Sequence, residues 1–284
     1  MIFLGPCFPA SNPSPALRGS VPRLACCLAA VLLVGCEQEQ PTATTAAPTA
    51  DESQIAEETN VDENVTETPT AESDSNRALR HAVFFSFKES ASAEDIQGVA
   101  DAFAALPSKI DVITDFQWGP NNSPENLNDG LTHCFLLSFA DEAGRDAYIP
   151  DPAHSGDFAD VLRPHMKDVF VIDYWGTKPE TEIEKELKHA VFFKFKDDAA
   201  AEDIKKVEDA FAALPSKIDS IKAFEWGKNN SPEGKDDGFT HCFMVTFDSE
   251  EGREAYLPHA DHKAFVEVLK PVLDKVRVLD FWEQ

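Results

Sequence analysis

The stretch Arg80-His-Ala-Val-Phe-Phe-Ser-Phe-Lys88 returns 108 residues later as Lys188-His-Ala-Val-Phe-Phe-Lys-Phe-Lys196. The same displacement holds far beyond these strands. Aligned without gaps, residues 80–154 and 188–262 share 47 identities in 75 positions. Such agreement indicates two tandem copies of one domain. The function of the chain therefore depends on what one copy does and on why two copies are joined.

The first 36 residues have the features of a secretory leader. Basic residues precede an apolar run over residues 24–34. This run is too short to span a bilayer, which takes roughly 20 residues, but it suits the core of a signal peptide. It ends in Leu33-Val-Gly-Cys36, which resembles the lipobox of bacterial lipoproteins. We expect residues 1–36 to be a lipoprotein signal peptide with Cys36 as the lipidation site; a plain signal peptide is the alternative.

Residues 37–77 differ sharply in composition from the rest of the chain. Thr, Ala, Pro, Glu and Asp dominate, and Arg77 is the first basic residue after Cys36. Because such a segment cannot bury enough apolar surface to offset its ordering entropy, we expect a disordered acidic tether. The whole chain carries a formal net charge of −26. A surface this acidic repels phosphate backbones, so nucleic acid is not an expected partner.

Only two of the six cysteines lie in the repeated sequence, Cys134 and Cys242, at equivalent positions. Two equivalent cysteines form neither a disulfide scaffold nor a metal cluster. We expect them to be buried small side chains, with a disulfide between the copies as the alternative.

The hydrophobic pattern of the first copy predicts four strands and three helical stretches. Alternation with aromatic residues over 81–87 is typical of a strand, and the other strands follow the same reasoning. Apolar side chains at helical spacing, preceded by capping residues, indicate the helices. We expect strands over 81–87, 109–118, 132–139 and 169–175, with a polar loop over 121–130. The first helix is expected over 93–106 with Ser92 as its cap, and a short helix is expected from the cap Asp141 to Tyr148. A last helical stretch is expected over 155–167, interrupted at Pro164.

The resulting order, β-α-β-β-α-β, is the split βαβ plan, in which helices cover one face of the sheet. The other face must also be covered, and the second copy offers a matching sheet. We therefore predict an α+β protein of two ferredoxin-like domains, residues 78–178 and 179–284. Their sheets are expected to pack face to face as a dimer fused into one chain, and we expect a monomer.

Several short motifs recur in order in both copies. They are the strand-one histidine, Trp-Gly-x-Asn-Asn-Ser from Trp118 and Trp226, Gly-x-Thr-His, Ala-Tyr-(x)5-His and a closing strand with an aspartate. Together they resemble the stress-responsive A/B barrel (Dabb) family of dimeric α/β barrels. Members of that family are usually homodimers, so the tandem copy looks like a covalent version of the family dimer.

The resemblance extends to plant polyketide cyclases of the olivetolic acid type, which close a poly-β-keto chain by an aldol step. It implies catalytic roles for Tyr148, His154, Tyr256 and His262. It implies pocket roles for His81, His133, Asp173, His189, His241 and Asp280, and we add Trp118 and Trp226 as candidate ligand contacts. The cyclase has His-Pro before its catalytic histidine, whereas copy one has Asp151-Pro152 and copy two has His259-Ala260.

If Tyr148 and His154 converge, the imidazole can take a proton beside a carbonyl while the phenol stabilises the enolate oxygen. We expect Asp173 to orient that imidazole and to select its tautomer. Such chemistry requires no cofactor, and the histidines lack the spacing of a zinc site, so we expect neither.

Each candidate also has a structural interpretation. The strand-one histidines can be hydrogen-bonded residues at the mouth of a core, and His133 and His241 have the same status. The two tryptophans can be core anchors. The Tyr–His pairs can be kept for packing alone. Because the fold hosts several chemistries, three hypotheses stay open: a binding module for a small apolar or aromatic molecule in each half, a cyclase or lyase, and a structural or interaction protein.

The expected location is the bacterial cell envelope, with the lipid anchor on the periplasmic or outer-membrane side. Glu37 follows the expected lipidated cysteine. An aspartate there would be the usual inner-membrane retention signal, so Glu37 favours the outer membrane. The expected partners are a small-molecule ligand and the membrane that holds the lipid.

Overall fold

A computed structural model describes residues 76–177 and 183–284. The expected signal peptide, Cys36 and the tether up to residue 75 lie outside these residues, as does the expected domain boundary between 178 and 179. Within the described ranges, no helix is both long enough and apolar enough to cross a membrane.

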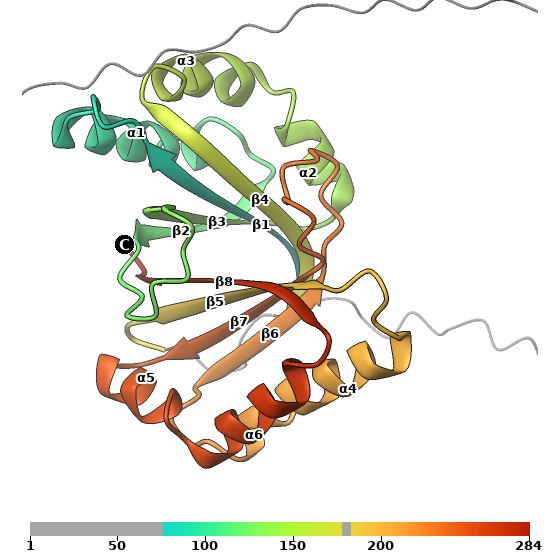
Figure 1. The fold of residues 1–284 in the computed structure, drawn as a ribbon. Coiled ribbons are helices and arrows are strands. Elements are labelled where there is room, and N and C mark those ends of the chain that lie inside the picture. Colours follow the sequence, from blue (N-terminus) through green and yellow to red (C-terminus); the bar gives the residue numbers. More distant parts are fainter. Residues whose placement is uncertain (1–75, 178–182) are drawn as a thin grey trace, which may run out of the picture. The chain divides into compact units, whose positions relative to one another are not determined.

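The first copy has the predicted order of strands and helices (Figure 1). Its strands are β1 (Arg77–Phe87), β2 (Ile113–Pro120), β3 (His133–Phe139) and β4 (Met166–Thr177). Its helices are α1 (Ala93–Ala104), a 3₁₀ turn (Leu106–Ser108), α2 (Glu142–Tyr148), a π-helix (Ala153–Phe158) and α3 (Ala159–Leu162).

The second copy repeats this order. Its strands are β5 (Leu187–Phe195), β6 (Ala223–Lys228), β7 (His241–Phe247) and β8 (Leu273–Trp282). Its helices are α4 (Ala201–Ala212), a 3₁₀ turn (Leu214–Ser216), α5 (Glu250–Tyr256) and α6 (Ala260–Leu269).

The predicted helix caps are present. Ser92 Oγ accepts from Asp95 N at 3.1 Å, and Asp95 Oδ2 accepts from Ser92 N at 2.8 Å, which is a complete capping box. Asp141 Oδ1 accepts from Gly144 N at 2.9 Å at the start of α2. These caps satisfy amides that a first helical turn leaves without partners.

Several predicted boundaries differ from the structure. The second strand begins at Ile113 instead of Lys109, because Lys109 caps the 3₁₀ turn and its N–H donates to Leu106 O at 2.9 Å. The last helical stretch ends at Leu162 instead of 167. β1 extends to Phe87, which pairs with Met166, so residues 166–168 belong to β4 instead of the helix.

The π-helix accommodates one extra residue in the first copy. His154 and Phe158 are four positions apart, whereas His262 and Phe265 are three apart. The ring centroids nevertheless lie 6.1 Å apart in the first copy and 6.2 Å apart in the second. A π-turn absorbs an inserted residue while it keeps both rings on one face.

Each copy forms a four-stranded antiparallel sheet, ordered β2-β3-β1-β4 and β6-β7-β5-β8. One apolar cluster lies between each sheet and its own helices. A third cluster contains residues from both copies, among them Phe84, Phe170, Phe192, Leu279 and Phe281. The two sheets therefore pack face to face with the helices outside, as predicted (Figure 1).

The two cysteines of the folded sequence lie in this shared cluster. Cys134 and Cys242 are buried with free thiols, so the expected burial is confirmed. Burial raises the pKa of both thiols well above its usual value.

Each sheet has an edge strand that lies against the other copy. A Cβ on Gly119 of β2 would overlap the carbonyl oxygen of Trp282 in β8. A Cβ on Gly227 of β6 would lie 2.9 Å from the Cβ of Tyr174 in β4. The glycine of each Trp-Gly motif is therefore required because another backbone approaches it closely.

The interface between the sheets is not symmetric. Arg277 stacks on the ring of Phe170 at 4.3 Å, and these two residues hold equivalent positions in β8 and β4. The Arg277 guanidinium also pairs with Asp129 and Asp237 at 2.7 and 3.0 Å. Equivalent positions meet across a two-fold axis, so two second copies would bring two arginines together. This contact favours pairing of the first copy with the second.

We expect Gly119→Ala to lower the free energy of unfolding by about 1–3 kcal/mol, because β2 would have to move away from β8. Gly98→Ala is the matched control, since Gly98 is exposed in α1 with nothing near the added Cβ. It should stabilise the chain by about 0.5–1 kcal/mol. Urea denaturation of the full chain measures both. Equal stability of the two variants would contradict the close approach.

Candidate functional site

A buried hydrogen bond between a histidine and an aspartate joins the first and last strands of each copy. The β1–β4 register places His81 directly opposite Asp173, and His81 Nδ1 lies 2.7 Å from Asp173 Oδ1. His189 and Asp280 repeat this contact at 2.7 Å. Since a carboxylate only accepts, Nδ1 carries the proton. The expectation that Asp173 orients His154 was wrong, because the strand register commits this aspartate to the strand-one histidine.

An arginine on the short helix completes the pairing of the aspartate. Arg145 Nη1 of α2 lies 3.4 Å from Asp173 Oδ2, and Arg253 Nη1 of α5 lies 2.9 Å from Asp280 Oδ2. Both arginines are buried. A buried carboxylate needs such compensation. Sequence reasoning missed these arginines, although Gly-Arg-x-Ala-Tyr is identical in the two copies.

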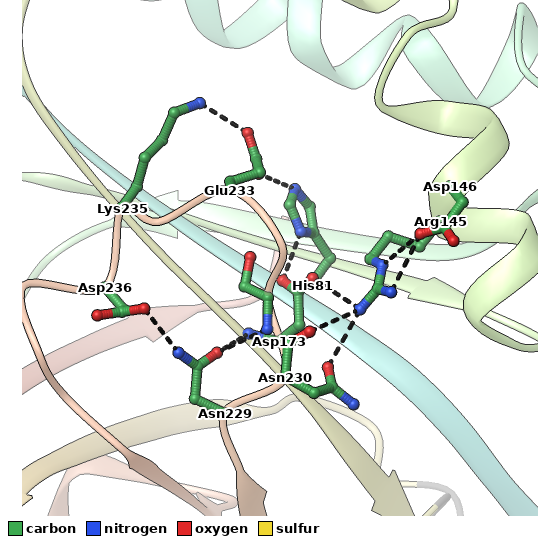
Figure 2. A network of polar contacts seen from close by, with 10 residues as sticks. His81, Arg145, Asp146, Asp173, Asn229, Asn230, Glu233, Lys235 and Asp236 are labelled. Carbon is green, nitrogen blue, oxygen red and sulfur yellow. Dashed lines mark hydrogen bonds and ion pairs between the residues drawn. The ribbon is translucent and has the colours of Figure 1, made fainter. Parts of the chain in front are cut away.

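The site of the first copy also contains residues from the second. Asp173 N donates to Asn229 Oδ1 at 3.1 Å, and Asn230 N donates to Asp173 O at 2.9 Å. Arg145 Nη1 donates to Asn230 O at 3.0 Å (Figure 2). Further along the same strand, Val171 N donates to Lys235 O at 3.0 Å. A loop of the second copy therefore pairs with the edge of β4.

A loop of the first copy makes the equivalent contact with β8 of the second copy. Asp280 N donates to Asn121 Oδ1 at 2.9 Å, Asn122 N to Asp280 O at 2.8 Å, and Val278 N to Leu127 O at 3.0 Å. We call residues 121–128 and 229–236 the crossing loops. Sequence reasoning expected only a polar turn here. The usable signal was Asn-Asn-Ser-Pro-Glu, which is identical in both copies.

The tyrosine and the histidine of each predicted pair do converge. Tyr148 ends α2 and His154 lies in the π-helix, and their rings stack at 4.2 Å between centroids. Tyr256 and His262 lie 4.4 Å apart in the second copy. The rings stack in the first copy and are tilted in the second, and no hydrogen bond joins tyrosine to histidine among the described residues.

The protonation of the pair follows from its surroundings. Ile149 O accepts from His154 Nδ1 at 2.9 Å, which places the proton on Nδ1 and leaves Nε2 without a partner in the described part of the chain. Burial lowers the pKa of His154, so its neutral form is favoured. The Tyr148 hydroxyl is buried without a hydrogen-bond partner among the described residues, and burial raises its pKa well above the usual value.

A cavity of about 360 Å³ reaches this pair in the first copy. Its walls are mainly apolar and come from the outer face of the sheet and from the helices above it. Polar groups are added by His81, Tyr148 and His154, and by Glu233 and Lys235 of the crossing loop. The apolar lining includes Val83, Phe85, Phe103, Phe158, Leu162, Met166, Val169 and Val171.

Four other predicted residues are held in separate contacts. His133 packs edge-on against Phe87 at 5.1 Å and does not line the cavity of the first copy. His241 Nε2 lies 3.0 Å from Glu208 Oε1. Trp118 stacks on Phe135 at 5.8 Å, and Trp226 stacks on Phe243 at 5.4 Å. These contacts match the structural interpretation of all four residues.

Residues 76–177 and 183–284 contain no group of three or more histidine, cysteine or acidic side chains that could hold a metal ion.

We expect His154 and His262 to titrate below the ordinary value of 6.5, since burial lowers the pKa of both. Burial alone would also lower the pKa of His189, but the charge and hydrogen bond of Asp280 raise it. Histidine resonances followed by NMR across pH 4–9 would test this order. The stability contributed by neutral His154 and His262 is present above pH 6.5 and is lost as the pH falls through their lowered values. Titration of His154 above His189, or a proton on its Nε2, would contradict the geometry.

Comparisons with known proteins agree with this architecture. The Stress responsive A/B Barrel Domain (Dabb) family matches residues 79–176 and 187–283. The stress-response A/B barrel domain-containing protein HS1 of Arabidopsis thaliana is 38% identical over 95 residues, which is 34% of this chain and 87% of the relative. Olivetolic acid cyclase of Cannabis sativa is 30% identical over 95 residues, which is 34% of this chain and 94% of the cyclase.

A solved structure shows the same fold across both copies. An anthrone oxidase-like protein covers 73% of this chain and 91% of its own, with a TM-score of 0.53 and 11% identity, which indicates a shared fold alone. The family match spans more than half of the sequence. The chain belongs to the stress-responsive A/B barrel family and carries its domain twice.

Proposed function

We propose that each half of the protein binds a small, largely apolar molecule whose polar end meets the Tyr–His pair. One observation carries this proposal: the buried Tyr148 hydroxyl has no partner among the described residues and lies at an apolar cavity. A buried hydroxyl without a hydrogen bond costs about 1–3 kcal/mol. A ligand atom that accepts from this hydroxyl removes that cost.

The Tyr148 hydroxyl and His154 Nε2 determine which polar group the ligand must carry at its end. Tyr148 can donate through its hydroxyl, and His154 can accept at Nε2 because its proton lies on Nδ1. A phenol, an enol or a hydroxyl group matches both, since its oxygen accepts and its hydrogen donates. A cavity of about 360 Å³ suits a small aromatic or short-chain molecule.

Proton-transfer catalysis is the second candidate. A neutral His154 could take a proton from a carbon beside a ligand carbonyl, and Tyr148 could stabilise the resulting enolate by a hydrogen bond. The enolate carbon would then attack a second carbonyl, whose oxygen takes the proton back from the histidine. The 30% identity to olivetolic acid cyclase supports this candidate.

We place binding first because of the proposed location. The lipobox-like Leu33-Val-Gly-Cys36 supports a lipid-anchored protein of the cell envelope, with the acidic segment as a tether. That location would separate the site from intracellular polyketide synthesis. The proposal also includes a monomer, which the unlike residues Phe170 and Arg277 at equivalent positions favour.

We expect native mass spectrometry of the full chain, purified gently from its own host, to show one or two small molecules retained per chain. Tyr148→Phe combined with Tyr256→Phe should lose them, because each replacement removes the hydroxyl that the ligand needs. Tyr174→Phe is the control, since that hydroxyl donates to Glu225 Oε1 at 2.9 Å and lies between the sheets. A ligand-free wild-type chain would argue against binding and favour a filled, structural barrel.

The retained molecule also separates binding from catalysis. We expect His154→Ala combined with His262→Ala to lower affinity by about tenfold or less, the effect of one lost hydrogen bond. Chemical conversion of the molecule by the wild-type chain, abolished in this variant while binding persists, would instead establish the catalytic candidate.

A further inference from the structure

The two crossing loops differ in charge at two equivalent positions, and one of these lines the cavity of the first copy. Asp236 corresponds to Asn128, but its carboxylate accepts from Asn229 Nδ2 at 3.1 Å and lies outside the cavity lining. Glu233 and Lys235 of the second loop correspond to Glu125 and Leu127 of the first. The loops share their backbone path, because Lys235 O and Leu127 O both accept from the facing strand at 3.0 Å. The residues between them have φ of 57° at Asn126 and 63° at Gly234. Leu127 therefore occupies the place that Lys235 holds in the other half.

In the first copy the loop carboxylate is paired. Lys235 Nζ donates to Glu233 Oε1 at 2.6 Å, and Glu233 Oε2 lies 3.9 Å from His81 Nε2 (Figure 2). Both loop residues line the cavity together with Arg163. Burial lowers the pKa of His154; of the two loop charges, Glu233 raises this pKa and Lys235 lowers it.

In the second copy the corresponding carboxylate has no lysine. Glu125 Oε2 lies 3.9 Å from His189 Nδ1 and is buried without a hydrogen bond to any described residue. Burial raises the pKa of Glu125. Buried Arg253 Nε and the Tyr256 hydroxyl also lack partners among the described residues. These three polar atoms without partners, Glu125 Oε2, Arg253 Nε and the Tyr256 hydroxyl, indicate a ligand that carries a polar group.

Apart from Asp236, which does not line the cavity, the charges around the two buried aspartates match. Asp173 and Arg145 in the first copy correspond to Asp280 and Arg253 in the second. The replacement of lysine by leucine therefore makes the second site one unit more negative. An anion beside a partly buried carboxylate that has no lysine partner is repelled, whereas an ammonium group can pair with it.

We propose that the two sites have diverged in ligand charge, with Lys235 and Leu127 as the residues that determine the difference. The first site takes an apolar molecule that carries a carboxylate or a similar anion. The second site excludes anions and takes an apolar molecule that carries an amine. This inference rests on the proposed binding function and gives one reason for joining two copies: the chain holds two unlike ligands.

Three probes with the same aromatic body test the proposal: 1-naphthylacetate, its neutral amide and 2-(1-naphthyl)ethylamine. Ala159 lines the first cavity, and Val266 is its equivalent in α6. Ala159→Trp should block the first site, and Val266→Trp should block the second. Calorimetry on the full chain then reports one site at a time. With the second site blocked, the acetate should bind about tenfold tighter than the amine. With the first blocked, the order should reverse.

The matched swaps are Lys235→Leu and Leu127→Lys. Each should invert the preference of the site that its loop enters and leave the other site unchanged. Equal affinities of all three probes at both sites would overturn the charge proposal and leave the binding function standing. No binding of any probe by the unblocked chain would instead count against the binding function itself.

Stability gives a readout that needs no ligand. The pKa of Glu125 is raised in the folded chain. Glu125 therefore lowers the free energy of unfolding once the pH exceeds the pKa that it has in the unfolded chain, and pH 7 lies in this range. Leu127→Lys should give Glu125 a partner and raise Tm by roughly 2 °C at pH 7. Lys235→Leu should lower Tm by a similar amount. No shift in either variant would mean that residue 127 does not reach Glu125, which would overturn the assignment.

Discussion

The edges of the two sheets impose the constraint on which the rest of the structure depends. β4 and β8 each end a sheet, and an open edge leaves backbone N–H and C=O groups without partners. The crossing loops supply those partners from the other copy, with hydrogen bonds at Val171, Val278 and the two aspartates. Edge glycines admit the close approach that this pairing needs. One copy alone would expose both this edge and the apolar inner face of its sheet.

The same pairing builds the candidate site. Asp173 is fully buried, and such a carboxylate persists only with compensating charges and hydrogen bonds. From the same copy, His81 supplies a hydrogen bond and Arg145 a positive charge, and the asparagines of the crossing loop supply hydrogen bonds from the other copy. Arg145 lies one turn before Tyr148, so the helix that presents Tyr148 is fixed by the interface. Folding, pairing of the copies and the proposed ligand recognition therefore share one set of contacts.

The local sequence pattern was sufficient to predict the parts of the fold that depend on local contacts. Period-two alternation located the strands, Ser92 and Asp141 located the helix starts, and the repeat indicated the facing sheet. The register of His81 with Asp173 joins residues 92 positions apart, and no local pattern encodes it. The crossing loops bridge separate copies, so a polar turn was all that their composition could indicate. The π-helix was recoverable in principle, because one extra residue separates His154 from Phe158.

The most direct test of this account is residue-resolved amide hydrogen exchange on the full chain. If the crossing loops close the sheet edges, the amides of Val171, Val278, Asn122 and Asn230 are hydrogen-bonded across the copies. They should then exchange as slowly as amides inside β1 and β5, because opening them requires separation of the sheets. Exchange of these four amides at the rate of an open loop, while β1 and β5 stay protected, would contradict the central claim.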